Sequence, residues 1–258
     1  MKHCLKILTV LLALLMLSGA VAAEELPASE PGQPEATAEQ RKLVALTFDD
    51  GPDLEMTAPV LDILERYGVR ATFFLVGNKI NGTSAPLVER AINLGCEIGC
   101  HGWDHRKMKE VSKEMNQKQI RQFFAALEEY VHVPVSVMLV RPPGGGTNAR
   151  VQRAIGELGL ADIIWDVDSQ DWVKPVKGKS KTDRIFHDVL DHVKDGSIVL
   201  MHDRHQTTPD SLENIIPALL EQGYELVTVS ELLTRNGDPI EPGVVYKCMP
   251  PKEPTALD

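Results

Sequence analysis

Residues 43–52 read Leu-Val-Ala-Leu-Thr-Phe-Asp-Asp-Gly-Pro, an apolar run that ends in two adjacent carboxylates and a turn sequence. The run is typical of a buried strand, and Asp-Gly-Pro alone is well suited to a turn. Adjacent carboxylates at a strand end repel each other unless each has its own cation or proton. The stretch therefore predicts either a simple turn or a site in which Asp49 is a general base and Asp50 binds a metal.

Six further short apolar runs follow and alternate with amphipathic segments. Strands are expected at residues 43–48, 71–76, 96–100, 137–140, 162–165, 197–201 and 225–229. The helices expected between them run from caps at Ser84, Ser112 and Thr182 to about Gly95, Tyr130 and Gly196, respectively. Strands and helices that alternate this often predict an α/β layer architecture or a barrel with largely parallel strands.

Polar side chains that could do chemistry cluster directly after these strands. They are Asp49, Asp50, His101, His105, Arg141, Asp168, Asp171, His202 and Asp203. In a parallel barrel the carboxyl ends of the strands meet at one face, where barrel active sites are built. The spacing therefore predicts a single site.

The pair His101 and His105 is the best candidate for metal binding. Four residues are one helical turn, so both imidazoles can face a common ion, and one carboxylate would complete the set. Two His and one carboxylate leave coordination positions open, as a catalytic Zn²⁺ requires. An isolated pair at this spacing more often caps a turn or faces solvent, but the charged motifs at the other strand ends favour the metal site.

The N-terminal residues are typical of a secretory signal peptide over residues 1–23. Lys2 and Lys6 precede an apolar run at 7–17, and Ala-Val-Ala follows at 20–22. The run is shorter than the ~20 residues of a membrane span, although an uncleaved anchor is the alternative. We therefore expect a protein that is secreted, extracellular or associated with the cell wall.

The rest of the chain suggests one catalytic domain. Residues 24–41, rich in Glu, Pro and Ala, are expected to be a disordered linker. Residues 42–235 have the size of a single domain, and residues 236–258 are expected to be a C-terminal tail.

Charge and cysteine content narrow the class of protein. The net charge of −10 becomes −10 − 2 = −12 without Lys2 and Lys6, which argues against nucleic acid and suits a neutral sugar backbone. Cys96 and Cys100 would lie ~13 Å apart in a strand, too far for a disulfide. Free thiols are favoured over a bridge from either one to Cys248.

Five motifs, in order, resemble the signatures of the NodB-like polysaccharide deacetylases, carbohydrate esterase family four. They are residues 47–52, the His101 and His105 pair, and residues 141–145, 168–172 and 200–202. The resemblance covers roughly residues 43–234 and implies the family's fold, an α/β distorted (β/α) barrel of the NodB-homology type in a single domain.

The resemblance also implies roles for individual residues. One divalent ion, Zn²⁺ or a similar ion such as Co²⁺, would be held by Asp50, His101 and His105, with Asp49 as base and His202 as acid. Arg141 would keep Asp49 ionised, and Asp171, with Asp168 as the alternative, would keep His202 protonated. The Gly144 N–H would help to hold the oxyanion, Leu200 would line the pocket for the acetyl methyl group, and Trp172 would wall it.

Two positions depart from the family pattern. Gly102 stands where the family usually has Ser or Thr, so a supporting hydrogen bond is lost and metal affinity is expected to be modestly lower. Gly144 stands where Tyr is common, which preserves an N–H but removes a wall of the sugar cleft. We therefore expect catalysis to survive with a changed subsite preference.

The expected activity is N-deacetylation of an extracellular amino-sugar polysaccharide, with N-acetylglucosamine or N-acetylmuramic acid of peptidoglycan as the favoured substrate. Chitin-type oligomers and O-acetyl groups such as those of xylan are alternatives. A non-catalytic glycan-binding or metal-binding module is the alternative of another class, but it would need neither Asp49 nor His202. Beyond the polysaccharide we expect no nucleic acid partner, no stable membrane association after cleavage, and a monomer.

Overall fold

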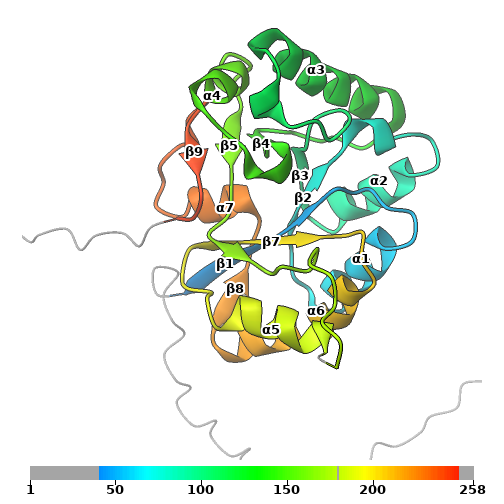
Figure 1. Cartoon of the computed structure of the whole chain (residues 1–258), viewed down its shortest axis with the longest axis vertical. Coiled ribbons are helices and arrows are strands. Elements are labelled where there is room, and N and C mark those ends of the chain that lie inside the picture. The colour runs from blue at the N-terminus through cyan, green and yellow to red at the C-terminus, as the bar shows by residue number, and fades with distance from the viewer. Residues whose placement is uncertain (1–40, 179, 250–258) are drawn as a thin grey trace, which may run out of the picture. The chain divides into compact units, whose positions relative to one another are not determined.

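The computed structural model describes residues 41–178 and 180–249 and shows one curled sheet of parallel strands with helices packed around it (Figure 1). The predicted signal peptide, residues 24–40 of the predicted linker and residues 250–258 lie outside the described residues. None of the helices in the described ranges is both long enough and apolar enough to cross a membrane.

The strands are β1 Lys42–Asp49, β2 Thr72–Leu75, β3 Glu97–Cys100, β4 Leu139–Val140, β5 Ala161–Ile163, β6 Val167–Asp168, β7 Ser197–His202, β8 Tyr224–Leu226 and β9 Val245–Tyr246. The α-helices are α1 Thr57–Tyr67, α2 Ala85–Asn93, α3 Lys113–Tyr130, α4 Ala149–Gly156, α5 Lys181–Leu190, α6 Thr207–Glu221 and α7 Val229–Leu233. In the part of the chain that the structure describes, the short 3₁₀ turns are η2 Gly77–Lys79, η3 Met108–Glu110 and η4 Pro143–Gly145.

The strand order is β6-β7-β1-β2-β3-β4-β5-β9, and every ladder is parallel. Strand β1 lies at the centre: it pairs with β7 along most of its length, and on its other side with β8 at its start and β2 at its end. Between β5 and β6 the chain crosses to β7, where the Asp166 N–H donates to the Ile198 carbonyl at 3.2 Å. The distorted (β/α) barrel predicted from the sequence is confirmed.

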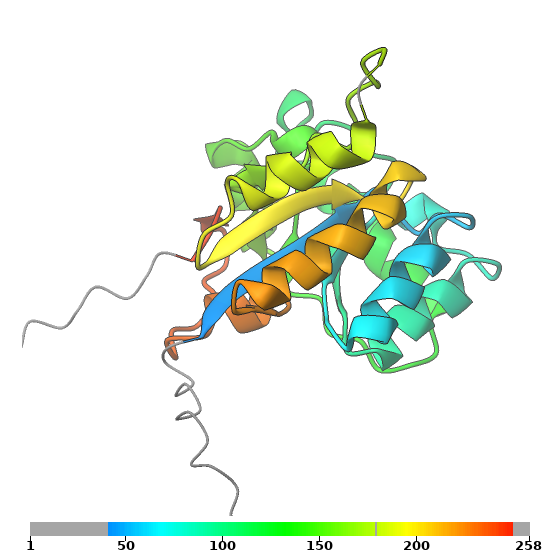
Figure 2. The same cartoon turned by 90° about the horizontal axis from the view of Figure 1, so that it is seen from below.

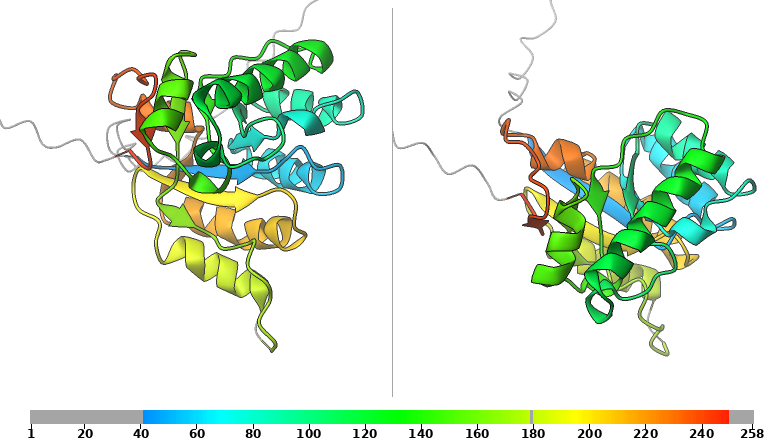
Figure 3. Two further views of the ribbon diagram at one scale, coloured as in Figure 1. Left: turned by 45° about the horizontal axis from the view of Figure 1, so that its top comes forward. Right: turned by 90° about the horizontal axis from the view of Figure 1, so that it is seen from above.

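The burial of the strands on both faces explains why they could be predicted from the sequence. Residues 44–48 of β1 are fully buried, because the inner face of the sheet fills the barrel and the outer face is covered by helices. Figure 2 shows α5 and α6 lying along β7 and β1, and Figure 3 shows α2 and α3 on the other side of the central strands; α1 packs between α6 and α2. A strand buried on both faces has an almost continuous apolar sequence rather than an alternating one.

The structure corrects several expected boundaries. Strands β6 and β9, of two residues each, were missed because no apolar run of strand length marks them in the sequence. Residues 236–249, expected in the tail, instead continue the domain, since β9 pairs with β5 and Cys248 forms an antiparallel bridge with Ser197. The tail prediction therefore begins too early.

Helix caps were only partly predicted. Ser112 caps α3 as expected, accepting a hydrogen bond from the Met115 N–H at 3.2 Å. Helix α5 is capped by Ser180 rather than Thr182, and Ser84 precedes α2 without capping it, because its hydroxyl instead donates to the Lys79 carbonyl. Residue 229, expected at the end of a strand, begins α7.

The three cysteines in the described residues are free, as the sequence favoured. Cys96 and Cys100 are buried, and burial raises the pKa of their thiols to about 11 and about 12, respectively. These thiols are therefore neutral members of the core at physiological pH.

Candidate active site

The candidate base, Asp49, ends β1 and lies level with His202 at the end of β7, because the two residues are partners in the β1/β7 register. Both are at the carboxyl end of the sheet, and the Asp49 side chain is 4% exposed. Its Oδ1 accepts a hydrogen bond from Arg141 Nη1 at 2.7 Å. The other oxygen, Oδ2, lies 3.6 Å from His101 Nε2. One oxygen of Asp49 is thus anchored, and the other faces the His101 imidazole.

Arg141, directly after β4, is fully buried and braces the site from within the barrel. Besides Asp49, its guanidinium donates to Thr47 Oγ1 at 2.7 Å and to the Ile164 carbonyl at 3.1 Å. It also lies 4.0 Å from the centre of the Phe74 ring. Burial lowers the pKa of Arg141 and the charge of Asp49 opposes this, so a buried ion pair forms inside a nearly complete set of hydrogen bonds.

Asp50, His101 and His105 bring three possible metal ligands together. One ligand atom from each lies within 4.8 Å of the other two. Asp50 Oδ1 is 3.5 Å from His101 Nε2 and 3.0 Å from His105 Nε2. Ligands bound tetrahedrally at about 2.0–2.1 Å from one ion are separated by roughly 3.3 Å, so these spacings suit a shared ion.

The polar atoms of this cluster also fit a metal. Asp50 Oδ1 is buried and has no hydrogen-bond partner in the described part of the chain, which is costly unless a cation is present. The Nδ1 of His101 lies 2.7 Å from the Arg141 carbonyl and donates to it, which leaves the lone pair on Nε2 facing Asp50. Arg141 therefore orients His101 with its backbone and Asp49 with its side chain.

Two of the three candidate ligands adopt left-handed backbone conformations. Asp50 has φ 77° and His105 has φ 60°, a region that non-glycine residues rarely enter and that tends to mark functional sites. The Asp50 carbonyl accepts a hydrogen bond from Lys79 Nζ at 2.7 Å. Burial disfavours the ionised form of Asp50, but contacts with His105, His101 and Arg204 lower its pKa overall. Asp50 is therefore fixed in place and ionised.

The candidate acid, His202, forms a pair with Asp171. His202 Nδ1 lies 2.7 Å from Asp171 Oδ1, and its backbone N–H donates to Oδ2 at 2.7 Å. Thr208 Oγ1 also donates to that Oδ2, at 2.7 Å. Burial opposes protonation of His202, but the bond to Asp171 and its charge raise the pKa overall. The imidazolium thus persists to a higher pH than in a free histidine.

Asp168, the alternative partner of His202, contacts other groups. Its Oδ1 accepts from the Gln170 N–H at 2.8 Å and from Trp172 Nε1 at 3.3 Å. Trp172 is 56% exposed, so the indole does not form part of a closed wall. Leu200 is buried in β7, two residues before His202.

The two glycines that depart from the family pattern have positive φ values. Gly102 has φ 77° and Gly144 has φ 67°. The loop at Gly102 is held by other groups: its carbonyl accepts from the Gly77 N–H at 2.9 Å, and Gln119 Oε1 accepts from the Trp103 N–H at 2.8 Å. A Cβ at Gly144 would meet no atom within 4 Å, so there is open space beside this residue.

Some supporting residues could not be found from the sequence. Four such residues hydrogen-bond to residues of the site but belong to no motif: Lys79, Gln119, Thr208 and Arg204. Of these, only Arg204 lies just after a motif, the one at residues 200–202.

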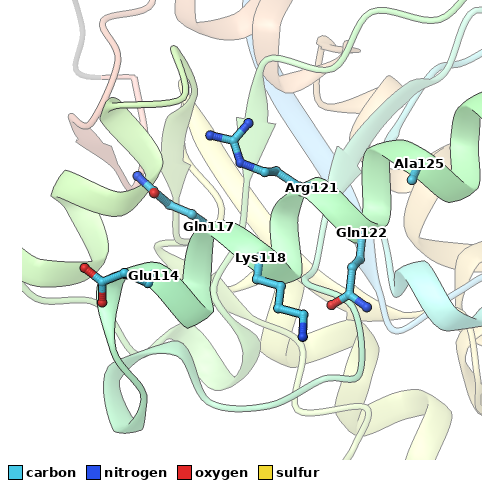
Figure 4. A pocket seen from close by; sticks show the side chains of 6 residues that line it. All are labelled: Glu114, Gln117, Lys118, Arg121, Gln122 and Ala125. Atoms are coloured by element: carbon cyan, nitrogen blue, oxygen red, sulfur yellow. The ribbon is translucent and has the colours of Figure 1, made fainter.

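A hollow of about 340 Å³ lies on α3 (Figure 4). It shares no residue with the site and is lined by Glu114, Gln117, Lys118, Arg121, Gln122 and Ala125.

Asp203 packs against the turn after β1. It is fully buried, accepts a hydrogen bond from Thr57 Oγ1, and lies so close to Gly51 that a Cβ there would collide with its carboxylate. Burial raises the pKa of Asp203 to about 7. Between pH 4 and pH 7 the folded chain therefore binds a proton that the unfolded chain releases, and this contribution to stability is lost as the pH rises.

We expect Asp203→Asn to flatten the pH dependence of folding. The amide does not titrate. The free energy of unfolding of the variant should therefore fall less than that of the wild type between pH 4.5 and pH 7.5. The difference is at most about 1.4 kcal/mol per unit of pKa shift. Denaturant unfolding at four pH values gives both slopes. Parallel slopes would show that the Asp203 carboxyl titrates normally.

A (β/α) barrel that carries an Asp-His-His cluster together with a buried carboxylate and an Asp-paired imidazole is typical of a metal-dependent hydrolase. The sequence profile described as polysaccharide deacetylase matches residues 36–163. A peptidoglycan-N-acetylglucosamine deacetylase of Bacillus cereus is 38% identical over 198 residues, which cover 74% of this chain and 88% of the relative. The chain belongs to the polysaccharide deacetylase family, as its motifs indicated.

Two further relatives show how far the likeness extends. PgdA, a peptidoglycan-N-acetylglucosamine deacetylase of Listeria monocytogenes, is 37% identical over 210 residues, which cover 81% of this chain but 42% of the relative. This chain thus spans less than half the length of that protein. A family 4 acetyl xylan esterase from Clostridium thermocellum, solved with a cobalt ion, matches with a TM-score of 0.73 at 36% identity, over 81% of this chain and 100% of the esterase.

Proposed function

We propose that this chain is a metal-dependent deacetylase that hydrolyses N-acetyl groups of an amino-sugar polysaccharide, with peptidoglycan as the substrate. One observation carries the proposal: Asp49, anchored by Arg141, and His202, anchored by Asp171, lie level on adjacent strands beside the Asp50, His101 and His105 cluster. A site with a base, an acid and a set of metal ligands has every group that amide hydrolysis requires.

The base and the acid act in sequence on the two sides of the reaction. The divalent ion, when bound by Asp50, His101 and His105, supplies a Lewis acid that polarises the acetyl carbonyl. Asp49 Oδ2, the oxygen not bonded to Arg141, takes the proton of the attacking water. His202, held protonated by Asp171, then gives a proton to the departing amine.

Substrate orientation is assigned to the residues around this centre. The Gly144 N–H is proposed to donate to the oxyanion, an interaction worth about 3 to 4 kcal/mol in other enzymes. Leu200 would contact the acetyl methyl group, and the exposed Trp172 ring would lie against the sugar at the rim. The missing side chain at Gly144 leaves room for a substituted sugar.

Peptidoglycan, whose acetyl groups are amides, is favoured over an O-acetylated polymer because amide hydrolysis requires a proton donor for the leaving group. An amine is a poor leaving group unless it is protonated, and the His202–Asp171 pair is built to supply that proton. Deacetylases of N-acetylglucosamine and of N-acetylmuramic acid both occur among the relatives by name. The predicted signal peptide at 1–23 supports action outside the cytoplasm, with residues 24–41 as the linker to the domain.

A second candidate function is O-deacetylation of a xylan-type polymer, because the acetyl xylan esterase shares this fold. The two candidates are separated by acetate release from purified peptidoglycan, N-acetylglucosamine oligomers and acetylated xylan, measured with the full chain and added Zn²⁺. We expect the highest kcat/KM on peptidoglycan. Faster release from xylan would favour the esterase, and release from none of them would favour a binding module.

A further inference from the structure

Arg204, two residues after His202, lies against the carboxylate of Asp50. Its Nη1 donates to Asp50 Oδ2 at 2.7 Å. The Asp50 side chain is 7% exposed, whereas that of Arg204 is 48% exposed. The two carboxylate oxygens therefore have different partners: Oδ1 faces His101 and His105 with no hydrogen bond in the described residues, and Oδ2 is taken by a guanidinium.

We propose that Arg204 weakens Asp50 as a metal ligand and thereby keeps the bound ion a strong Lewis acid. The inference rests on the proposed function, because it requires a divalent ion at the cluster. A cation bonded to Oδ2 draws charge away from the carboxylate, so less charge is donated through Oδ1. The guanidinium and the divalent ion are also two cations bound to the same carboxylate, and they repel each other.

The competing role for Arg204 would be to orient Asp50. Groups that hydrogen-bond to a metal ligand often do this, and their loss typically weakens metal binding by about 10- to 100-fold. Asp50, however, has other supports: Lys79 Nζ donates to its carbonyl at 2.7 Å, and the residue directly follows the central strand β1. These supports hold the backbone of Asp50, and its carboxylate is buried, so we expect its orientation to persist without Arg204 and the charge effect to dominate.

The charge effect can be measured as metal affinity. Removing one positive charge beside a divalent ion changes its binding by about tenfold even when the charges interact through a water-like dielectric. Arg204→Met keeps the aliphatic stem and removes the charge. We therefore expect this variant to bind Zn²⁺ and Co²⁺ about tenfold more tightly, and to have a lower kcat on acetylated glycan when saturated with metal. Tighter binding with slower turnover is not expected from misfolding or from a lost ligand.

The test is calorimetric titration of the metal-stripped full chain with Zn²⁺ and with Co²⁺. Arg204→Lys keeps the charge and should remain close to the wild type. Arg66→Met is the matched control, because Arg66 is a similarly exposed arginine paired with Glu213 at the far end of α1. It should leave metal affinity unchanged.

The outcomes separate the inference from the proposed function. Unchanged or weaker metal binding by Arg204→Met would overturn the inference, and so would an undiminished kcat at saturating metal. Failure of the wild-type chain to bind either ion would instead overturn the metal-dependent function on which the inference rests. Tighter metal binding by Arg204→Met, and by neither Arg204→Lys nor Arg66→Met, would support the inference.

Discussion

Replacing Asp49 with Asn is expected to lower kcat by about 10² to 10⁴-fold while the metal site stays intact. The amide has nearly the same shape as the carboxylate but cannot accept the proton of water. Because Asp49 Oδ1 bonds to Arg141 and Oδ2 only approaches His101, the metal ligands are unchanged in the variant. Acetate release and metal content, measured on the same preparation, test both parts.

Stability has to be checked alongside, because Asn leaves the buried Arg141 without a counter-charge. Breaking such a pair can cost about 3 to 5 kcal/mol. Asp53→Asn, the same chemical change in the same loop, is the control, since within residues 41–178 and 180–249 the Asp53 side chain accepts only from the Glu55 and Met56 N–H groups. A folded, metal-loaded Asp49→Asn enzyme with wild-type kcat would exclude Asp49 as the base.

The second large effect is expected at His202, and it should depend on the leaving group. His202→Asn removes the proton donor, so hydrolysis of an N-acetyl amide should slow by about 10² to 10⁴-fold. An O-acetyl ester of an activated alcohol needs less protonation and should lose much less activity. Paired assays on an N-acetyl oligosaccharide and an aryl acetate measure this ratio. Equal losses on both substrates would mean that His202 does not act as the acid.

The fold could be predicted because its strands are buried on both faces. Residues 43–48 stand out as an apolar run, and the same holds for most strands that pack inside the barrel. Strands β6 and β9 have two residues each and show no such run. They form because neighbouring strands offer free edges, which is a property of the assembled sheet.

The residues of the candidate site could be predicted equally well where they lie at the ends of strands. Asp49, Asp50, Arg141 and His202 are placed by β1, β4 and β7, so their convergence follows from parallel strand order. Contacts made across separate elements could not be foreseen, such as the hydrogen bonds from Lys79 and Arg204 to Asp50. The choice of Asp171 over Asp168 beside His202 likewise depends on how the loop after β6 folds back.

Metal dependence is the central claim, and acetate release from purified peptidoglycan tests it most directly. The protein is assayed after metal removal, after addition of Zn²⁺, and as Asp50→Ala with added Zn²⁺. We expect release only from the Zn²⁺-loaded wild type, because Asp50 Oδ1 belongs to the cluster and has no hydrogen-bond partner among the described residues, so it is available to the ion. Undiminished release from protein shown to contain no metal, or full activity of Asp50→Ala, would contradict the account.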